Sequence, residues 1–112
     1  MSGRRFIQVI MPLQLEWEPF YYYDLEDGAS PLEEGDRIRV GFAGKEYVAV
    51  VSNPDAGAEA AGIGIGKIRP VLQTDIGLAP VSKTETELWR QVASYYLCTV
   101  GEVYKAAYPA GK

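Results

Sequence analysis

The chain has 112 residues, with 11 basic and 15 acidic side chains and a formal net charge of −4. This length suits one domain and is too short for an ATPase or a two-domain enzyme, and the negative charge argues against a surface that grips duplex DNA along its whole extent. Histidine is absent and Cys98 is the one cysteine, which excludes a histidine-based catalytic triad, an intrachain disulfide and a zinc cluster.

The N-terminal region begins with a short apolar run. Residues 6–11 are apolar and β-branched almost throughout, and Pro12 follows them. This pattern predicts a core strand that ends at the proline. The run is too short for a signal peptide or a membrane span, so we expect a cytoplasmic protein with no membrane partner.

A dense aromatic run follows, and residues 20–25 within it are predicted to form the second strand. Because alternate residues of a strand face opposite ways, Phe20 and Tyr22 should share one face, and Tyr21 and Tyr23 the other. One set should pack inward and the other should stay at the surface. Exposed rings beside basic residues suit stacking on single-stranded nucleic acid, but ordinary β-barrels carry such rings as well.

The middle of the chain predicts a β-hairpin. Residues 37–42 alternate apolar with polar or small side chains, residues 43–46 make a tight connection, and residues 47–52 return as a strand. Residues 53–66 are rich in glycine, alanine and aspartate without an apolar period, which predicts a mobile surface loop. Residues 67–72 are strand-like and contain a proline, so they predict an edge strand or a bulge.

The C-terminal part has a helical pattern. Capping-box signals at residues 82–87 and 99–102 predict one helix and then a second, short helix that runs through residue 107. Apolar residues at three- and four-residue steps predict the buried stripe of the first helix; they include Leu88, Val92, Tyr95, Tyr96 and either Cys98 or Thr99. The expected fold is mainly β with C-terminal helices, of the α+β class. It is a small antiparallel β-barrel or rolled sheet over about residues 6–72, with one or two α-helices packed on it over about residues 82–108.

Two motifs that suggest catalysis or phosphate binding fail on their spacing. The glycine run at residues 62–67 departs from a phosphate loop, because Ala61 and Ile68 stand where that motif needs glycine and serine or threonine. The acidic clusters suit turns and helix caps, and no base or nucleophile accompanies them. Cys98 is interpreted as a small buried hydrophobe. We therefore expect no catalytic residue, no cofactor and no bound metal in this chain.

The basic residues form two pairs on predicted strands. Arg37 and Arg39 share one face of a strand, Lys67 and Arg69 share one face of another, and Lys45 lies at the hairpin tip. On an acidic protein, these pairs are compatible with a local anion site. The alternative is a solvated sheet face with ion pairs to one of the nearby acids, namely Glu33, Glu34 or Glu46.

The order of these features is more specific than any one of them. The ordered set comprises Met-Pro-Leu at 11–13, the aromatic run opened by Phe20, Gly-Asp-Arg-Ile-Arg-Val-Gly-Phe-Ala-Gly at 35–44, Val-Val at 50–51, Lys-Ile-Arg-Pro-Val-Leu at 67–72, and Trp89 followed by Ala-Ser-Tyr-Tyr at 93–96 and Gly-Glu-Val at 101–103. Together they resemble the N-terminal domain of the replication-restart helicase family PriA, also called primosomal protein N-prime. The resemblance covers nearly the whole chain, from residue 6 to residue 109.

The resemblance implies a single N-terminal DNA-binding domain that is a fragment of a longer 3′-to-5′ DNA helicase. Such a domain binds the 3′ end of single-stranded or nascent leading-strand DNA at a stalled replication fork. The other domains of the parent helicase, and possible replication-restart proteins, are the implied protein partners. ATP, Mg and Zn are implied only for the parent helicase. A barrel-type protein–protein interaction module, in which the aromatics form a peptide groove, is the alternative function.

The resemblance also implies a set of site residues. Phe20 matches an aromatic that stacks on the terminal base, Gly44 or its neighbour Ala43 matches a turn glycine near the sugar, and Arg69 matches a basic position at the edge of the site. Tyr21 stands where the family often has aspartate.

Three further points complete the expected site. Lys45 and Lys67 are added to it as neighbouring cations. Gly41 stands where the family often has proline. Tyr21 belongs to the expected DNA-binding residues because its hydroxyl can donate or accept a hydrogen bond.

Overall fold

The computed structural model describes residues 3–62, 64 and 67–108. Its centre is a five-stranded sheet with the strand order β3-β4-β1-β2-β5. Neighbouring strands are antiparallel, except that β5 runs parallel to β2. The strands are β1 (Gly3–Ile10), β2 (Phe20–Leu25), β3 (Arg37–Phe42), β4 (Lys45–Asn53) and β5 (Arg69–Pro70).

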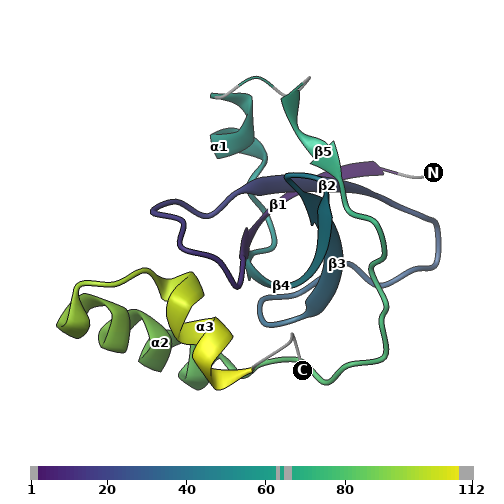
Figure 1. Cartoon of the computed structure of the whole chain (residues 1–112). Helices are drawn as coiled ribbons and strands as arrows, with labels where there is room; N and C mark the ends of the chain where they lie inside the picture. The colour runs from purple at the N-terminus through teal and green to yellow at the C-terminus, as the bar shows by residue number, and fades with distance from the viewer. Residues whose placement is uncertain (1–2, 63, 65–66, 109–112) are drawn as a thin grey trace.

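The sheet is strongly curled (Figure 1), and the segment that follows β5 reaches the other edge strand, β3. The amide of Val71, directly after β5, donates to the carbonyl of Tyr22 in β2 at 2.8 Å. Two residues later, Gln73 exchanges backbone hydrogen bonds with Arg39 in β3, at 3.0 and 3.2 Å. One short segment therefore connects β2 to the opposite edge strand, which confirms the predicted rolled sheet.

The inside of the curled sheet holds the main core. Alternate residues of each strand face inward, as strand geometry requires, and large aliphatic and aromatic side chains fill the space. The buried members are Ile7, Val9, Met11, Tyr21, Tyr23, Ile38, Val40, Ala49 and Val51. The alternation predicted for the aromatic run is confirmed, because Tyr21 and Tyr23 lie in this core.

Two helices cover part of the outer face of the sheet, namely α2 (Lys83–Tyr96) and α3 (Val100–Ala107). Both begin at the predicted caps: the Ser82 hydroxyl accepts from the Glu85 amide at 3.1 Å, and Thr99 and Glu102 form a capping box. The ring of Trp89 stacks on Tyr104, with centroids 5.2 Å apart. This second core joins the helices to the sheet.

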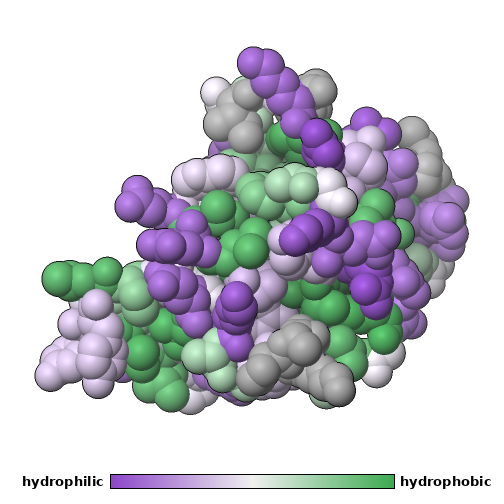
Figure 2. Space-filling model, viewed as in Figure 1, coloured by the Kyte–Doolittle hydropathy of each residue, from purple (hydrophilic) through white to green (hydrophobic). Residues whose placement is uncertain are grey.

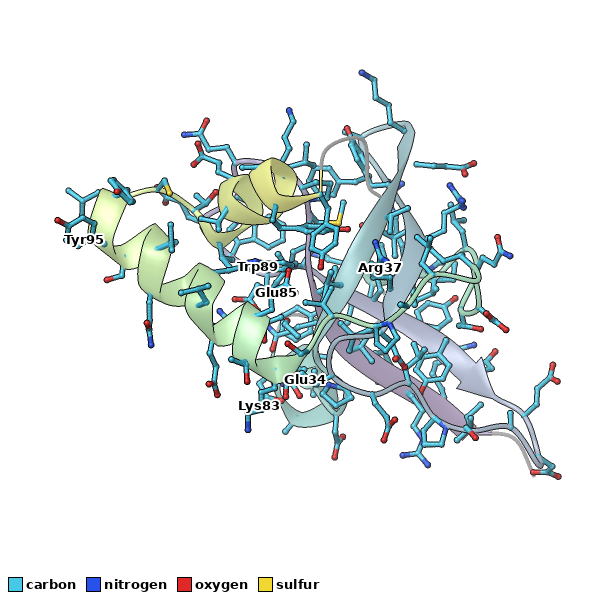
Figure 3. All side chains as sticks on the ribbon, turned by 90° about the horizontal axis from the view of Figure 1, so that it is seen from below. Glu34, Arg37, Lys83, Glu85, Trp89 and Tyr95 are labelled. Atoms are coloured by element: carbon cyan, nitrogen blue, oxygen red, sulfur yellow. The ribbon has the colours of Figure 1, made fainter. Side chains whose placement is uncertain are left out.

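The predicted buried stripe of α2 is wrong. The residues of α2 that are buried are Thr86, Trp89 and Ala93, whereas Leu88, Tyr95 and Tyr96 are exposed. Figure 3 shows Tyr95 at the end of α2 that lies away from the sheet, and Trp89 on the side of α2 that faces α3. Both sets of residues have helical spacing, and the indole of Trp89 is the larger surface to bury. Cys98 is only half-buried.

The segment predicted as a mobile loop contains a short helix, α1 (Gly57–Ala61). Ala56 and Ala60 are fully buried, and the Ala56 amide donates to the Phe6 carbonyl at 2.9 Å. Small alanine side chains let this helix lie close against β1. The sequence did not predict the helix because these residues show no periodic pattern of large apolar side chains. The glycine run at 62–67 falls partly outside the described residues. None of the helices in the described ranges has the length and apolarity to span a bilayer.

Candidate nucleic-acid interface

A cavity of about 510 Å³ opens at one rim of the curled sheet. It lies where the start of β2, the turn between β3 and β4, the segment that leads into β5 and the loop before β2 come together. Its walls are mainly apolar, with contributions from Trp17, Pro19, Phe20 and Phe42. A cavity of this size lies within the roughly 300–1,000 Å³ range of pockets that hold small ligands.

Two rings of β2 line this cavity, Phe20 from the outer face of the strand and Tyr21 from the inner face. On the same outer face, Tyr22 is already covered: the Arg4 guanidinium lies 4.2 Å from its ring centroid, and the Phe6 ring packs 6.2 Å away. Phe20 is half-buried, and no aromatic ring in the described part of the chain stacks on it. Of the two rings on the outer face, Phe20 is therefore the one at the cavity that no other ring and no cation covers in the described part of the chain.

Tyr21 forms part of the cavity floor. It is 3% exposed, and its hydroxyl donates to the Gly41 carbonyl at 2.7 Å, which ties β2 to β3. Burial raises the pKa of Tyr21, although the nearby Arg69 opposes the shift. The phenol therefore stays protonated at neutral pH, and its one proton is already used within the protein.

The turn between β3 and β4 places Ala43 at the cavity, whereas Gly44 and Lys45 do not line it. Ala43 and Gly44 have φ angles of 50° and 82°, as in the type I′ turns that connect two paired strands. Of the two positions that the sequence offered for the turn residue of the site, Ala43 is the one that lines the cavity.

Two cations, Lys67 and Arg69, lie at the rim of the cavity. Both are exposed, and neither forms an ion pair within residues 3–62, 64 and 67–108. Arg69 is the register partner of Tyr21 across the β2–β5 pair. The cavity thus has two cations with no carboxylate bound to them among the described residues.

The other predicted basic pair does not join this site. Arg37 donates to the Ala79 carbonyl at 2.9 Å, and its guanidinium lies 5.1 Å from the ring centroid of Tyr108. Neither Arg37 nor Arg39 lines the cavity. Arg37 instead contacts the loop before α2 and the C-terminal end of α3. The cavity lining therefore includes one of the two predicted basic pairs, Lys67 and Arg69, and not the other.

Glu18 is a cavity residue that sequence reasoning missed. It supplies the one carboxylate found among the described residues that line the cavity. Arg90 of α2 donates two hydrogen bonds to that carboxylate, at 2.8 and 2.9 Å. Burial, the largest single influence, opposes ionisation of Glu18, but hydrogen bonding from Arg90 and Ser52 and the positive charge of Arg90 together outweigh it, so the pKa of Glu18 lies below its ordinary value. No local pattern connects residue 18 to residue 90.

Trp17 was also missed as a site residue, although it opens the predicted aromatic run. Its side chain is 59% exposed and lines the cavity beside Pro19. The signal available in the sequence was its place at the start of the aromatic run that contains Phe20. No group of three or more potential metal ligands occurs within residues 3–62, 64 and 67–108.

Comparison with known protein families identifies the domain. The family model of the PriA 3′ DNA-binding domain (3′BD) matches residues 8–109, a range that includes all the cavity residues named above. A search of curated proteins found no match. Because the family model spans most of the chain, this chain belongs to the family of PriA 3′ DNA-binding domains.

Proposed function

We propose that the cavity beside Phe20 holds the 3′ end of single-stranded or nascent leading-strand DNA. One observation supports this proposal above all: the uncovered ring of Phe20 and two cations, Lys67 and Arg69, line the same cavity. Neither cation forms an ion pair in the described part of the chain, which belongs to the family of PriA 3′ DNA-binding domains. A strand end has one base face that no following base covers, so a single ring can take that face.

The expected energetics suit a protein that must act at any sequence. Stacking of a base on an aromatic ring contributes roughly 1–3 kcal/mol and depends little on base identity. Two cations engage few phosphates, so binding should weaken only gradually with salt. A module with a net charge of −4 can work with such weak contacts if other domains also hold the DNA.

We further propose that the domain acts within a cytoplasmic, PriA-like 3′-to-5′ helicase at stalled replication forks. ATP, Mg²⁺ and Zn²⁺ would then be needed by the helicase and not by this domain, which takes no catalytic step in the proposal. Exposed side chains at the end of α2, namely Tyr95, Tyr96 and Leu97, support contact with neighbouring domains of that helicase. Figure 2 shows apolar residues gathered over the region where α2 lies in Figure 1.

Fluorescence anisotropy with two labelled DNA hairpins tests end recognition. One hairpin has a single-stranded 3′ tail and the other a 5′ tail of the same sequence. We expect tighter binding of the 3′-tailed hairpin, and Phe20→Ala should weaken that binding roughly tenfold because the stacking face is lost.

Tyr22→Ala is the matched control, since Tyr22 lies on the same strand face without lining the cavity. It should change the affinity less than about twofold. Equal affinity for the two hairpins would refute end recognition. If neither hairpin bound, the protein–protein interaction module would become the better proposal.

A further inference from the structure

A site that admits a 3′-hydroxyl end and rejects a 3′-phosphate end needs an element that acts against the phosphate. Such elements are a negative charge that repels it or a wall that leaves no room for it. A terminal phosphate carries a charge of about −1.5 to −2 at pH 7, with a second pKa near 6. Whether the cavity of this protein can bind a terminal phosphate therefore depends on the charges of its lining residues and on its size.

The negative charge on the cavity wall is neutralised. Glu18 is the carboxylate that the described lining residues contain, and both of its oxygens accept hydrogen bonds from Arg90. Its side chain is 24% exposed, so it cannot turn freely toward a ligand without losing the bidentate pair. Glu18 is thus held beside a compensating cation instead of facing an incoming phosphate alone.

The floor of the cavity has no negative charge either. Tyr21 is protonated, and its hydroxyl proton is bound to the Gly41 carbonyl. Arg69 lies next to Tyr21 in the sheet, and Lys67 lies on the same rim. Guanidinium groups bind phosphate through two parallel hydrogen bonds, which makes Arg69 a suitable partner for a phosphate monoester.

The size of the cavity does not exclude a terminal phosphate. The cavity measures about 510 Å³ and is open to solvent at the rim that carries both cations. Ala43, with its small side chain, forms the part of the rim contributed by the β3–β4 turn. Neither a repulsive charge nor a bulky side chain from these positions closes the cavity to a terminal phosphate.

We infer that this cavity accepts DNA ends with a 3′-phosphate at least as well as ends with a 3′-hydroxyl, with Arg69 and Lys67 as the phosphate ligands. The inference rests on the proposed function and specifies its ligand class. Three observations support the inference: Arg90 neutralises the charge of Glu18, Tyr21 is protonated, and the two cations at the open rim form no ion pair in the described part of the chain.

The test uses the 3′-tailed hairpin with either a 3′-hydroxyl or a 3′-phosphate, and the 5′-tailed hairpin as the reference for end recognition. We expect the 3′-phosphate end to bind about threefold to tenfold more tightly at roughly 50 mM salt, with a smaller advantage as salt rises. The advantage should also decrease from about pH 7.5 to about pH 5.5, because the phosphate then takes up a proton. A phosphate on the 5′ end of the 3′-tailed strand should give no such gain.

Arg69→Gln should bring the ratio of the two affinities close to one. Lys83→Gln removes one positive charge from α2 outside the cavity and should leave the ratio unchanged. Arg90→Gln should reduce the phosphate advantage without touching the cavity lining, because Glu18 then keeps its charge without its partner.

The outcomes separate the inference from the function on which it rests. A preference for the 3′ tail together with tighter binding of the hydroxyl end would overturn the inference alone. A phosphate advantage that survives both Arg69→Gln and Lys67→Gln would overturn the assigned ligands. Equal binding of the 3′- and 5′-tailed hairpins would overturn the proposed function and the inference with it.

Discussion

Ala43 illustrates, at the scale of single residues, a backbone position that its side chain does not favour. Its φ angle is 50°, in the left-handed region where a Cβ atom costs roughly 1–2 kcal/mol. The neighbouring Gly44, with φ of 82°, has no such penalty. The two-residue turn nevertheless keeps β3 and β4 in register and holds Ala43 at the cavity.

Ala43→Gly should therefore raise the free energy of unfolding by about 0.5–1 kcal/mol, because relief of the left-handed strain exceeds the added flexibility of the unfolded chain. Urea unfolding followed by circular dichroism measures the change. Ala58→Gly is the matched control: Ala58 is an exposed residue of α1, and this change should lower stability by up to about 1 kcal/mol. A loss of stability in Ala43→Gly would contradict the strain argument.

At the scale of secondary-structure elements, the contact between α3 and the loop after β1 depends on one glycine. Gly101 is buried, and a Cβ atom placed on it would overlap the carbonyl oxygens of Met11 and Leu13. The same loop continues to Trp17 and Glu18 at the cavity. Close approach of α3 therefore supports the wall of the proposed DNA site.

Gly101→Ala should lower the free energy of unfolding by about 1–3 kcal/mol, because α3 or the loop must move to admit the methyl group. Gly57→Ala is the control, since nothing lies within 4 Å of a Cβ at that position in α1, and it should be neutral or stabilising by up to about 1 kcal/mol. Thermal unfolding of both variants measures the difference. Equal stability of the two variants would show that α3 does not need this close approach.

At the scale of the whole molecule, Tyr104 joins the helices to the sheet. Its ring stacks on Trp89 of α2, and its hydroxyl donates to the Val48 carbonyl in β4 at 2.8 Å. Burial raises the pKa of Tyr104 to about 12, from an ordinary value near 10. The folded state therefore holds this proton more tightly than the unfolded state does.

The sign of the pH dependence follows from that difference. Stability from Tyr104 is fully present below about pH 10, where both states are protonated, and it is lost as pH rises toward about 12. Urea unfolding at about pH 8 and about pH 11 should show this loss, and Tyr104→Phe should reduce it while costing about 1 kcal/mol at neutral pH for the missing hydrogen bond. Tyr21, whose pKa is also raised, should leave part of the loss in the variant. An identical loss in both proteins would exclude Tyr104 as its source.

Features that depend on residues close together in the chain could be predicted from the sequence alone. The strands at 20–25 and 37–42, the caps at Ser82 and Thr99, and the opposite faces of Phe20 and Tyr21 all agree with the structure. Strand alternation and helix capping act between residues at most a few positions apart, so their signals lie within short stretches.

Features that depend on how distant segments pack together could not be predicted from the sequence. The Glu18–Arg90 pair, the Tyr21 hydrogen bond to Gly41 and the closure of the sheet through residues 71–73 each join segments far apart in the chain. The family resemblance supplied Phe20 and Arg69, but the folded chain decided that Lys67 lies with them at the cavity and that Gly44 and Lys45 do not. A local pattern can fix which way a side chain points within its strand, whereas which distant groups it meets depends on long-range packing.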